Sequence, residues 1–306
     1  DMIYMFIKEE EKCPKFKAIF IDEAQDLSPI QWKMFDILKK KSEDIYLAGD
    51  DDQAIYAWAG ADVNRFIDES AENEKVLEQS RRIPRSVQEL SEVVLNRIEG
   101  KRKIKQYLPR DEDGSVEKIF NLDQIDLHQG NWLILARTGS RLMEIMDLLK
   151  QKGIFYQTKK GKSFKVHLYK CILNYEKSKV HPLTDSELDD IKEFMDKDTI
   201  DPSVPWYEAF SKAPQNEIQY IRLMLSNREK LSQDARVRLS TIHAIKGGEE
   251  DNVILILDNA RKIRRAVQDS LNKRDEEHRV WYVAITRAKQ KLYLHRAKIE
   301  RNGYQL

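Results

Sequence analysis

The stretch KAIFIDEAQD, residues 17–26, places a short apolar run directly before a dense group of acids. The run is typical of a β-strand, and Asp22, Glu23 and Asp26 follow it at once. Carboxylates crowded in this way repel one another unless a cation lies among them. The stretch therefore predicts a strand that ends in a cation-binding loop, with Mg²⁺ as the candidate cation.

Length and composition bound the class of protein. The 306 residues predict two domains, and 34% charged with 41% hydrophobic residues is typical of a soluble, rather helical globular chain. No apolar run approaches the roughly 20 residues that span a bilayer, so we expect no membrane contact. Cys13 and Cys171 have no metal-type spacing, which predicts free thiols in a reducing compartment.

Charge is nearly balanced over the chain. A net charge of +1 does not indicate a general polyanion-binding surface. Basic runs occur at residues 81–85, 101–105, 159–165 and 261–265. Each run is either a solvated face or a local contact to nucleic acid or phosphate.

Strand-like and helical patterns alternate along much of the chain. Further strands are expected at 44–49, 131–136, 237–242 and 252–257, and helices at 29–41, 140–153 and 278–290. Continuous apolar strands interleaved with helices are typical of parallel sheet covered on both faces. Residues 166–235 are polar, helix-like and interrupted by proline, which predicts a helical insertion in an α/β protein.

Two of these strands end in acids. Residues 22–26 follow the first strand, and residues 50–53 (DDDQ) follow the second. In open α/β sheets ligands bind outside the carboxyl ends of strands. Nucleotide hydrolysis requires one carboxylate that holds Mg²⁺ and one that activates water, and an amide such as Gln53 can sense a γ-phosphate. The alternative is two solvated loops, because acids are common at helix N-termini.

Aromatic and arginine side chains add to this pattern. Tyr56 and Trp58 are flanked by small residues and offer either a platform for a nucleobase or core packing. Arg81, Arg82 and Arg287 are candidates for stabilising charge on a transferred phosphoryl group, or else surface charges.

Six segments, in this order, closely resemble superfamily-1 DNA helicases of the UvrD/Rep/PcrA type: DEAQD, GDDDQAIYAWAGAD, LEQSRR, WLILARTGSRL, VRLSTIHAIKGGEEDNVIL and EEHRVWYVAITRAKQKLYL. They match motifs II, III, IV, IVa, V and VI of that family. The resemblance implies RecA-like sheets, ATP and Mg²⁺ as cofactors, single-stranded or duplex DNA as partner, 3′ to 5′ movement, and a cytoplasmic or nucleoid location.

The resemblance also implies residue roles. Asp22 would bind Mg²⁺, Glu23 would activate water, and Gln53 would report the state of the γ-phosphate. Arg82 and Arg287 would reach the γ-phosphate. The remaining roles are nucleotide contacts at Glu249 (the sugar), Gly247 and Arg81, and DNA contacts or coupling at Tyr56, Trp58, Thr241 and His243.

Three positions depart from the family pattern. Ser80-Arg81 replaces an Asn-Tyr pair whose tyrosine stacks on adenine in the family. Ala59 stands where the family has an arginine, and Gly247-Gly248-Glu249 replaces Gly-Leu-Glu.

The family's glycine-rich phosphate loop has no counterpart in these residues. It lies well upstream of the DEAQ-type motif, and only about 20 residues precede Asp22. Gly161-Lys162-Ser163 imitate the end of the loop signature, but Tyr156 occupies the place of its first glycine. We therefore expect the C-terminal portion of a helicase, truncated or processed before Asp1, whose loop is supplied by a missing N-terminal portion or a partner chain.

The expected domains follow from this resemblance. Residues 1–76 would form the C-terminal part of a first RecA-like domain, residues 77–165 and 236–306 a second, and residues 166–235 the insertion. The main interpretation is an ATP-driven helicase or translocase whose isolated chain is inactive. The alternatives are a non-catalytic module that binds DNA or a partner, against which Glu23 argues, and a metal-dependent phosphohydrolase.

Overall fold

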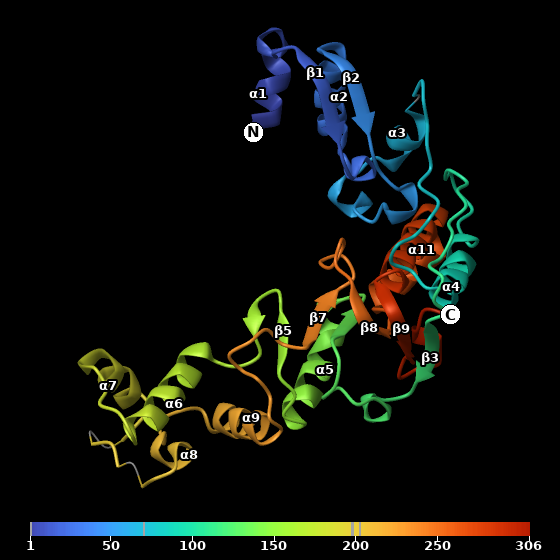
Figure 1. Cartoon of the computed structure of the whole chain (residues 1–306). Helices are drawn as coiled ribbons and strands as arrows, with labels where there is room; N and C mark the ends of the chain where they lie inside the picture. The colour runs from blue at the N-terminus through green and yellow to red at the C-terminus, as the bar shows by residue number, and fades with distance from the viewer. Residues whose placement is uncertain (1, 70, 197–198, 202) are drawn as a thin grey trace. The chain divides into compact units, whose positions relative to one another are not determined.

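The structure is a computed structural model that describes residues 2–69, 71–196, 199–201 and 203–306. Its contacts divide the chain into two compact units (Figure 1). Unit 1 holds residues 1–124, 135–138 and 241–306, and unit 2 holds residues 125–134 and 139–240.

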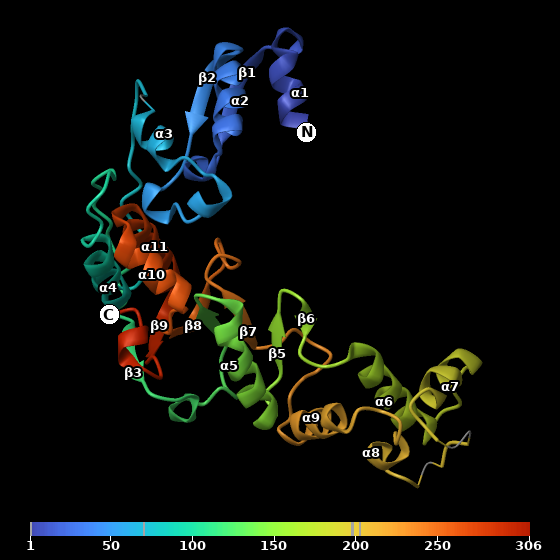
Figure 2. The ribbon, with the colours of Figure 1, turned by 180° about the vertical axis from the view of Figure 1, so that it is seen from behind.

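The first part of unit 1 is a small α/β layer. The strands β1 (Phe16–Ile21) and β2 (Ser42–Leu47) are parallel, with Ile19 opposite Ile45. One face of this sheet is covered by α2 (Pro29–Lys40), whose Trp32 and Phe35 pack with partly buried apolar residues of both strands (Figure 2). A capping box at Ser28 and Pro29 in the first turn fix where α2 begins. The helices α1 (Met2–Lys8) and α3 (Val63–Asp68) complete this part.

The opposite face of the β1–β2 sheet is open. Phe20 and Tyr46 lie side by side on it, with ring centroids 4.7 Å apart and planes 7° from parallel. Their exposed fractions are 76% and 54%. The prediction of a sheet covered on both faces is therefore wrong for these two strands, which alternate in burial and bury one face.

The rest of unit 1 supplies parallel strands and the helices around them. It includes α4 (Arg85–Leu95), β3 (Ser115–Ile119), β8 (Glu250–Ile256), α10 (Arg261–Asp269), α11 (Leu271–Ile285) and β9 (Ala288–His295). β9 pairs in parallel with β3 and with β8. From Asp275 to its end, every residue of α11 except Glu276 is buried. This helix packs against α4.

Unit 2 contains the remaining strands and the helical region. Its strands are β5 (Tyr156–Thr158), β6 (Gly161–Lys162) and most of β7 (Val237–Thr241), and its helices are α5 (Gly139–Gln151), α6 (Val166–Ser178), α7 (Asp185–Lys192), α8 (Trp206–Ala209) and α9 (Gln215–Ser226). β5 pairs antiparallel with β6 and parallel with β7. An apolar cluster that includes Leu168, Tyr175 and Phe210 forms its core.

The predicted α/β class is confirmed in its general form. With β4 (Trp132–Ala136), seven strands form a mainly parallel sheet in the order β3-β9-β8-β4-β7-β5-β6. All five expected strands are present within a few residues, and the described part of 166–235 is helical without strands. Cys13 and Cys171 are free thiols, and both are buried. No helix within the described ranges has the length and apolar character needed to cross a bilayer.

The helix expected at 278–290 is wrong at its end. α11 stops at Ile285, and Ala288 to Gln290 already belong to β9. Ala, Lys and Gln favour helices, but β9 pairs with a strand on each side, and this tertiary pairing outweighs local propensity. β3, β5, β6 and β9 were not predicted as strands.

Candidate functional site

The acidic loop after β1 presents its first two carboxylates to solvent. Asp22 and Glu23 are both exposed, and the Glu23 amide donates a 2.9 Å hydrogen bond to Asp22 Oδ1. Glu23 has a φ of 53°, in the left-handed region that residues other than glycine rarely adopt. Such backbone strain is concentrated at functional sites in proteins.

Gln25 connects this loop to the loop after β2. Its side chain is fully buried, and its Nε2 donates to Glu23 Oε2. Its Oε1 accepts a 3.0 Å hydrogen bond from the Asp50 amide. A Cβ atom added to Gly49 would lie 2.5 Å from the same oxygen. Gln25 therefore fixes the position of Glu23 relative to β2. This role was not predicted from the sequence, although Gln25 is part of the DEAQD motif.

Lys246 is the cation that lies among the acids of the first loop. Its side chain is 7% exposed, and its Nζ forms ion pairs with Asp26 and, at 3.3 Å, with Glu23. Burial raises the pKa of Asp26, and the hydrogen bond and charge of Lys246 only partly offset this effect. The repulsion among these carboxylates is thus reduced by a lysine from motif V.

The second acidic loop is neutralised from within unit 1. Asp51 and Asp52 are buried, Lys105 Nζ lies 2.7 Å from Asp50 and 3.2 Å from Asp52, and it also pairs with Asp51. Arg102 forms two 2.9 Å hydrogen bonds with the carboxylate of Asp52. Burial raises the pKa of Asp50, but the charge of Lys105 and the hydrogen bonds from Lys105, Gln53 and Tyr107 together outweigh burial, so the pKa is lowered.

These contacts revise two sequence interpretations. In the basic run at 101–105, the side chains of Arg102 and Lys105 bind the aspartates of the second loop and are little exposed, so these two residues stabilise the fold and do not form a solvated face. The three aspartates have the spacing of a metal-binding group, but Lys105 already occupies their centre. A phosphohydrolase with its metal at both acidic loops is not supported.

Gln53 and Arg287 are brought together although they are far apart in sequence. Arg287 is 1% exposed and donates to Gln53 Oε1 at 3.3 Å. The Gln53 amide nitrogen donates to Asp50 at 2.8 Å, which fixes the orientation of the side chain. Burial, and then the charge of Arg82, lower the pKa of Arg287 to about 10, so this guanidinium stays charged at neutral pH.

The other predicted nucleotide residues surround this pair. Arg82 forms an ion pair with Glu249, and both side chains are about one-third exposed. Arg81 is exposed, and Gly247 has a φ of 85°, which suits glycine. Ser80, at the place of the family's asparagine, accepts hydrogen bonds from the Arg82 and Ile83 amides through its Oγ and so shapes the loop that carries the two arginines.

The predicted DNA residues form an aromatic group. Tyr56 donates a 2.8 Å hydrogen bond to the His243 carbonyl, and the rings of Trp58 and His243 are 6.2 Å apart. Trp58 is 69% exposed. Burial, and then the charge of Arg137, lower the pKa of His243 to about 4, so its ring is neutral at pH 7. Thr241 ends β7, and its carbonyl accepts from the Ala244 amide in the turn that carries His243.

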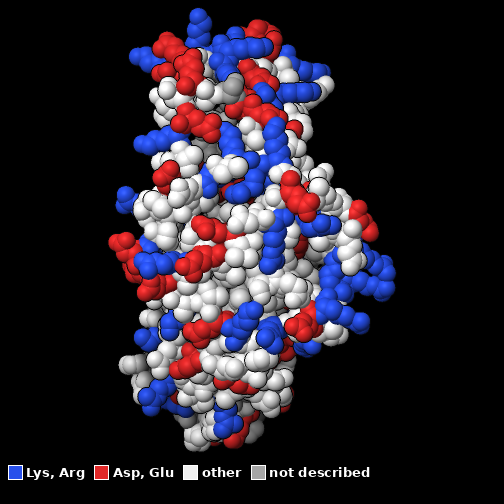
Figure 3. All heavy atoms as spheres, turned by 90° about the vertical axis from the view of Figure 1, so that its right-hand side faces the viewer, with Lys and Arg blue, Asp and Glu red and all other residues white. Residues whose placement is uncertain are grey.

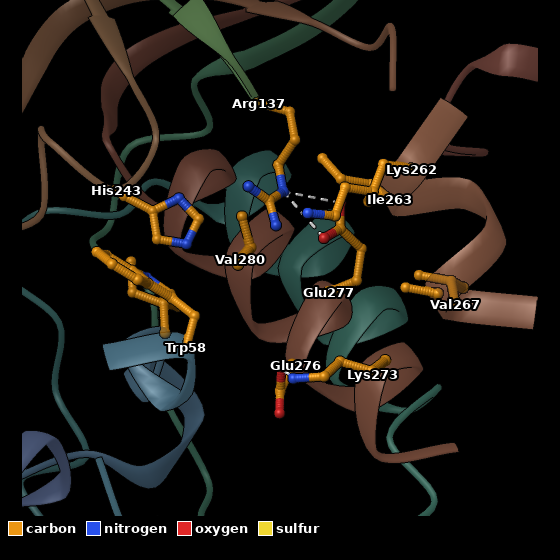
Figure 4. Close-up of a pocket in the computed structure, with 12 residues that line it drawn as sticks. Trp58, Arg137, His243, Lys262, Ile263, Val267, Lys273, Glu276, Glu277 and Val280 are labelled. Carbon is orange, nitrogen blue, oxygen red and sulfur yellow. Dashed lines mark hydrogen bonds and ion pairs between the residues drawn. The ribbon is translucent and has the colours of Figure 1, made fainter. Parts of the chain in front are cut away.

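A pocket of about 460 Å³ opens beside this group (Figure 4). One part of it is lined by Ile55, Trp58, Arg137 and His243, and the rest by residues of α10 and α11. Arg137 follows β4 and is held by Glu277, which lies 2.9 Å away and is buried. Sequence reasoning missed Arg137, although a charged residue directly after a buried strand is a usable signal.

The residues present fit Mg²⁺ and a nucleotide in part. Asp22 and Glu23 offer exposed carboxylate oxygens, the ligand type that Mg²⁺ prefers. Arg82, Arg287 and Gln53 offer donors for phosphate oxygens. Glycine-rich backbone of the kind that holds β- and γ-phosphates is not found in the sequence.

Comparison with known proteins identifies the class of this α/β chain. The family model described as UvrD/REP helicase N-terminal domain matches residues 9–74, and that described as UvrD-like helicase C-terminal domain matches residues 206–298. The chain belongs to the UvrD/Rep/PcrA-type helicase family.

Individual relatives match over parts of their length. The ATP-dependent DNA helicase PcrA of Staphylococcus aureus is 28% identical over 194 residues, 54% of this chain and 26% of PcrA. The ATP-dependent DNA helicase Rep of Buchnera aphidicola is 44% identical over 60 residues, 20% of this chain and 9% of Rep. DNA helicase II of Haemophilus influenzae is 42% identical over 52 residues. The matched stretches thus span about a quarter or less of these relatives.

Proposed function

We propose that this chain is part of an ATP-dependent DNA helicase that moves along single-stranded DNA from 3′ to 5′. The observation that carries the proposal is the contact between Gln53 and Arg287 beside the Arg82–Glu249 pair. Residues from motifs III, IV, V and VI thereby meet in one cluster of unit 1. Such convergence of arginines, an amide and carboxylates is what phosphoryl transfer from a nucleotide requires.

Each side chain has a role in this proposal. Asp22 would hold Mg²⁺, which would neutralise phosphate charge, and Glu23 would accept the proton of the attacking water. Arg82 and Arg287 donate to the γ-phosphate oxygens, and Gln53 senses whether that phosphate is present. Glu249 contacts the nucleotide sugar, with Gly247 and Arg81 nearby. In this structure Arg82 is paired with Glu249, and Lys246 is paired with Glu23. Nucleotide binding would therefore have to break these two ion pairs before Arg82 and Glu23 could take the proposed roles.

DNA is proposed to bind at the aromatic group. The exposed ring of Trp58 stacks on a base, and Tyr56 supports the turn of His243 through its 2.8 Å hydrogen bond. Because Tyr56 binds the motif V segment that also contains Gly247 and Glu249, this segment connects the proposed nucleotide cluster with the proposed DNA site. A protein with this substrate would work in the cytoplasm or at the nucleoid.

The catalytic assembly is proposed to need a further segment that carries the phosphate loop. The support is the open β1–β2 face with Phe20 and Tyr46, since parallel sheets are normally covered on both faces. A missing N-terminal portion or a partner chain would cover it. In this proposal residues 1–76 belong to a first RecA-like domain, 77–165 and 236–306 to a second, and 166–235 to the insertion.

Binding of fluorescein-labelled oligo-dT by the 306-residue chain tests the DNA part of the proposal. We expect Trp58→Ala to cost about 1–3 kcal/mol of binding free energy, roughly 5- to 150-fold in Kd, because one stacked base is lost. Phe120→Ala is the control, since Phe120 is also exposed, at 62%, but lies outside the site. Equal affinity of the wild type and Trp58→Ala, measured by fluorescence anisotropy, would contradict the proposal.

A non-catalytic, DNA-binding helicase-like module is the second candidate. The ion pairs of Lys246 with Glu23 and Asp26 favour it. Glu23 is the proposed water-activating acid, and its carboxylate is here paired with a lysine. The two candidates differ in one outcome. A non-catalytic module would bind DNA but would not hydrolyse ATP even when a phosphate-loop segment is supplied.

A further inference from the structure

The helix α10 carries four basic residues within its first five positions, Arg261, Lys262, Arg264 and Arg265. Among the residues that the structure describes, none of the four has a carboxylate within ion-pair distance. By contrast, the basic run at 101–105 is paired with aspartates. On the face shown in Figure 3, basic and acidic side chains alternate over large areas, as expected for a net charge of +1.

The charge pattern of α10 opposes helix formation. Its first turn has no acidic residue, and Ala260 provides no side-chain cap. Cations near a helix N-terminus interact unfavourably with the helix dipole. Arg261 also repels Arg264 and Arg265, three and four residues further on. None of the four basic residues is buried, so core packing does not explain their clustering. A bound polyanion would remove both kinds of repulsion.

The position of α10 indicates which polyanion. Its Lys262, Ile263 and Val267 line the pocket that Trp58 and His243 also line (Figure 4). The side of the pocket with Trp58 offers an exposed aromatic face, and the side with α10 offers two apolar side chains beside a cation. Stacking faces next to cations are the combination with which proteins hold single-stranded nucleic acid.

We propose that α10 binds the phosphate backbone of single-stranded DNA whose bases stack at Trp58. Lys262 at the pocket and Arg265, one turn further on, contact successive phosphates, and Ile263 and Val267 contact the sugars between them. The inference rests on the proposed DNA-binding function and adds the element that carries the backbone charge.

The salt dependence of oligo-dT binding tests this role. In a plot of log K against log salt concentration, each phosphate contact to a single strand contributes a slope of about −0.7. Lys262→Gln/Arg265→Gln should therefore reduce the slope by about 1.4 and weaken binding at low salt. Lys159→Gln/Lys160→Gln is the matched control, because it removes the same charge from two exposed lysines of another basic run. Lys262→Arg/Arg265→Lys should keep the wild-type slope.

The possible results separate the inference from the function on which it rests. If Trp58→Ala weakens binding but the α10 double variant leaves affinity and slope unchanged, the inference is wrong and the proposed function stands. Equal losses in the α10 variant and in Lys159→Gln/Lys160→Gln would indicate a general charge effect and overturn the inference. A wild-type chain that does not bind oligo-dT at all would overturn the proposed function as well.

Discussion

At the scale of single residues, the site is organised by cations that neutralise acids from other segments. Lys246 lies among the carboxylates of the first loop, and Lys105 among those of the second. The acids themselves could be predicted, because each group directly follows a strand. Their partners could not, because a lysine 220 residues from Asp26 is brought there by the fold alone.

His243 provides a prediction about pH. Burial and the charge of Arg137 lower its pKa from 6.5 to about 4, so the folded state binds this proton more weakly than the unfolded state. The contribution of His243 to stability is therefore complete above about pH 6.5 and is lost as the pH falls towards 4. We expect its ring resonance, assigned with His243→Gln, to titrate near pH 4 in an NMR experiment. A midpoint near 6.5 would contradict the described burial.

At the scale of elements, the segment 101–107 shows why a basic run is ambiguous in sequence. Its Lys105, Arg102 and Tyr107 all bind the loop after β2, whereas the basic residues of α10 have no carboxylate partner within the described part of the chain. The two runs have similar composition, and only the fold distinguishes them. Strand positions were predictable from apolar runs, but β9 was partly assigned to a helix because its pairing partners lie far away in sequence.

Replacing Lys105 tests the structural role of this segment. Lys105→Met leaves Asp51 and Asp52 buried with a charge uncompensated, so we expect a loss of about 3–5 kcal/mol in the free energy of unfolding. Lys101→Met is the control in the same run, since Lys101 and its partner Asp68 are about half exposed. It should cost about 1 kcal/mol or less in urea denaturation.

Two results bear on this expectation. Adding Asp51→Asn to Lys105→Met should recover part of the lost stability, because one uncompensated charge is removed. Equal unfolding free energies for Lys105→Met and Lys101→Met would show that Lys105 does not stabilise the acidic loop.

At the scale of the whole molecule, the family and the α/β class could be predicted from six short motifs. Those motifs predict the residues of the proposed site, but not which of them are in contact. The contact between Gln53 and Arg287, the pocket beside Trp58 and the open face at Phe20 and Tyr46 depend on packing between distant segments.

The central claim is that this chain holds the arginines, glutamine and acids of a helicase nucleotide site without the loop that holds the phosphates. The most direct measurement is ATP hydrolysis by the 306-residue chain, with and without single-stranded DNA, beside Glu23→Gln. The account predicts no turnover above that of the Glu23→Gln variant under either condition. DNA-stimulated turnover that disappears in Glu23→Gln would contradict it, because it would reveal a phosphate-binding loop within these residues.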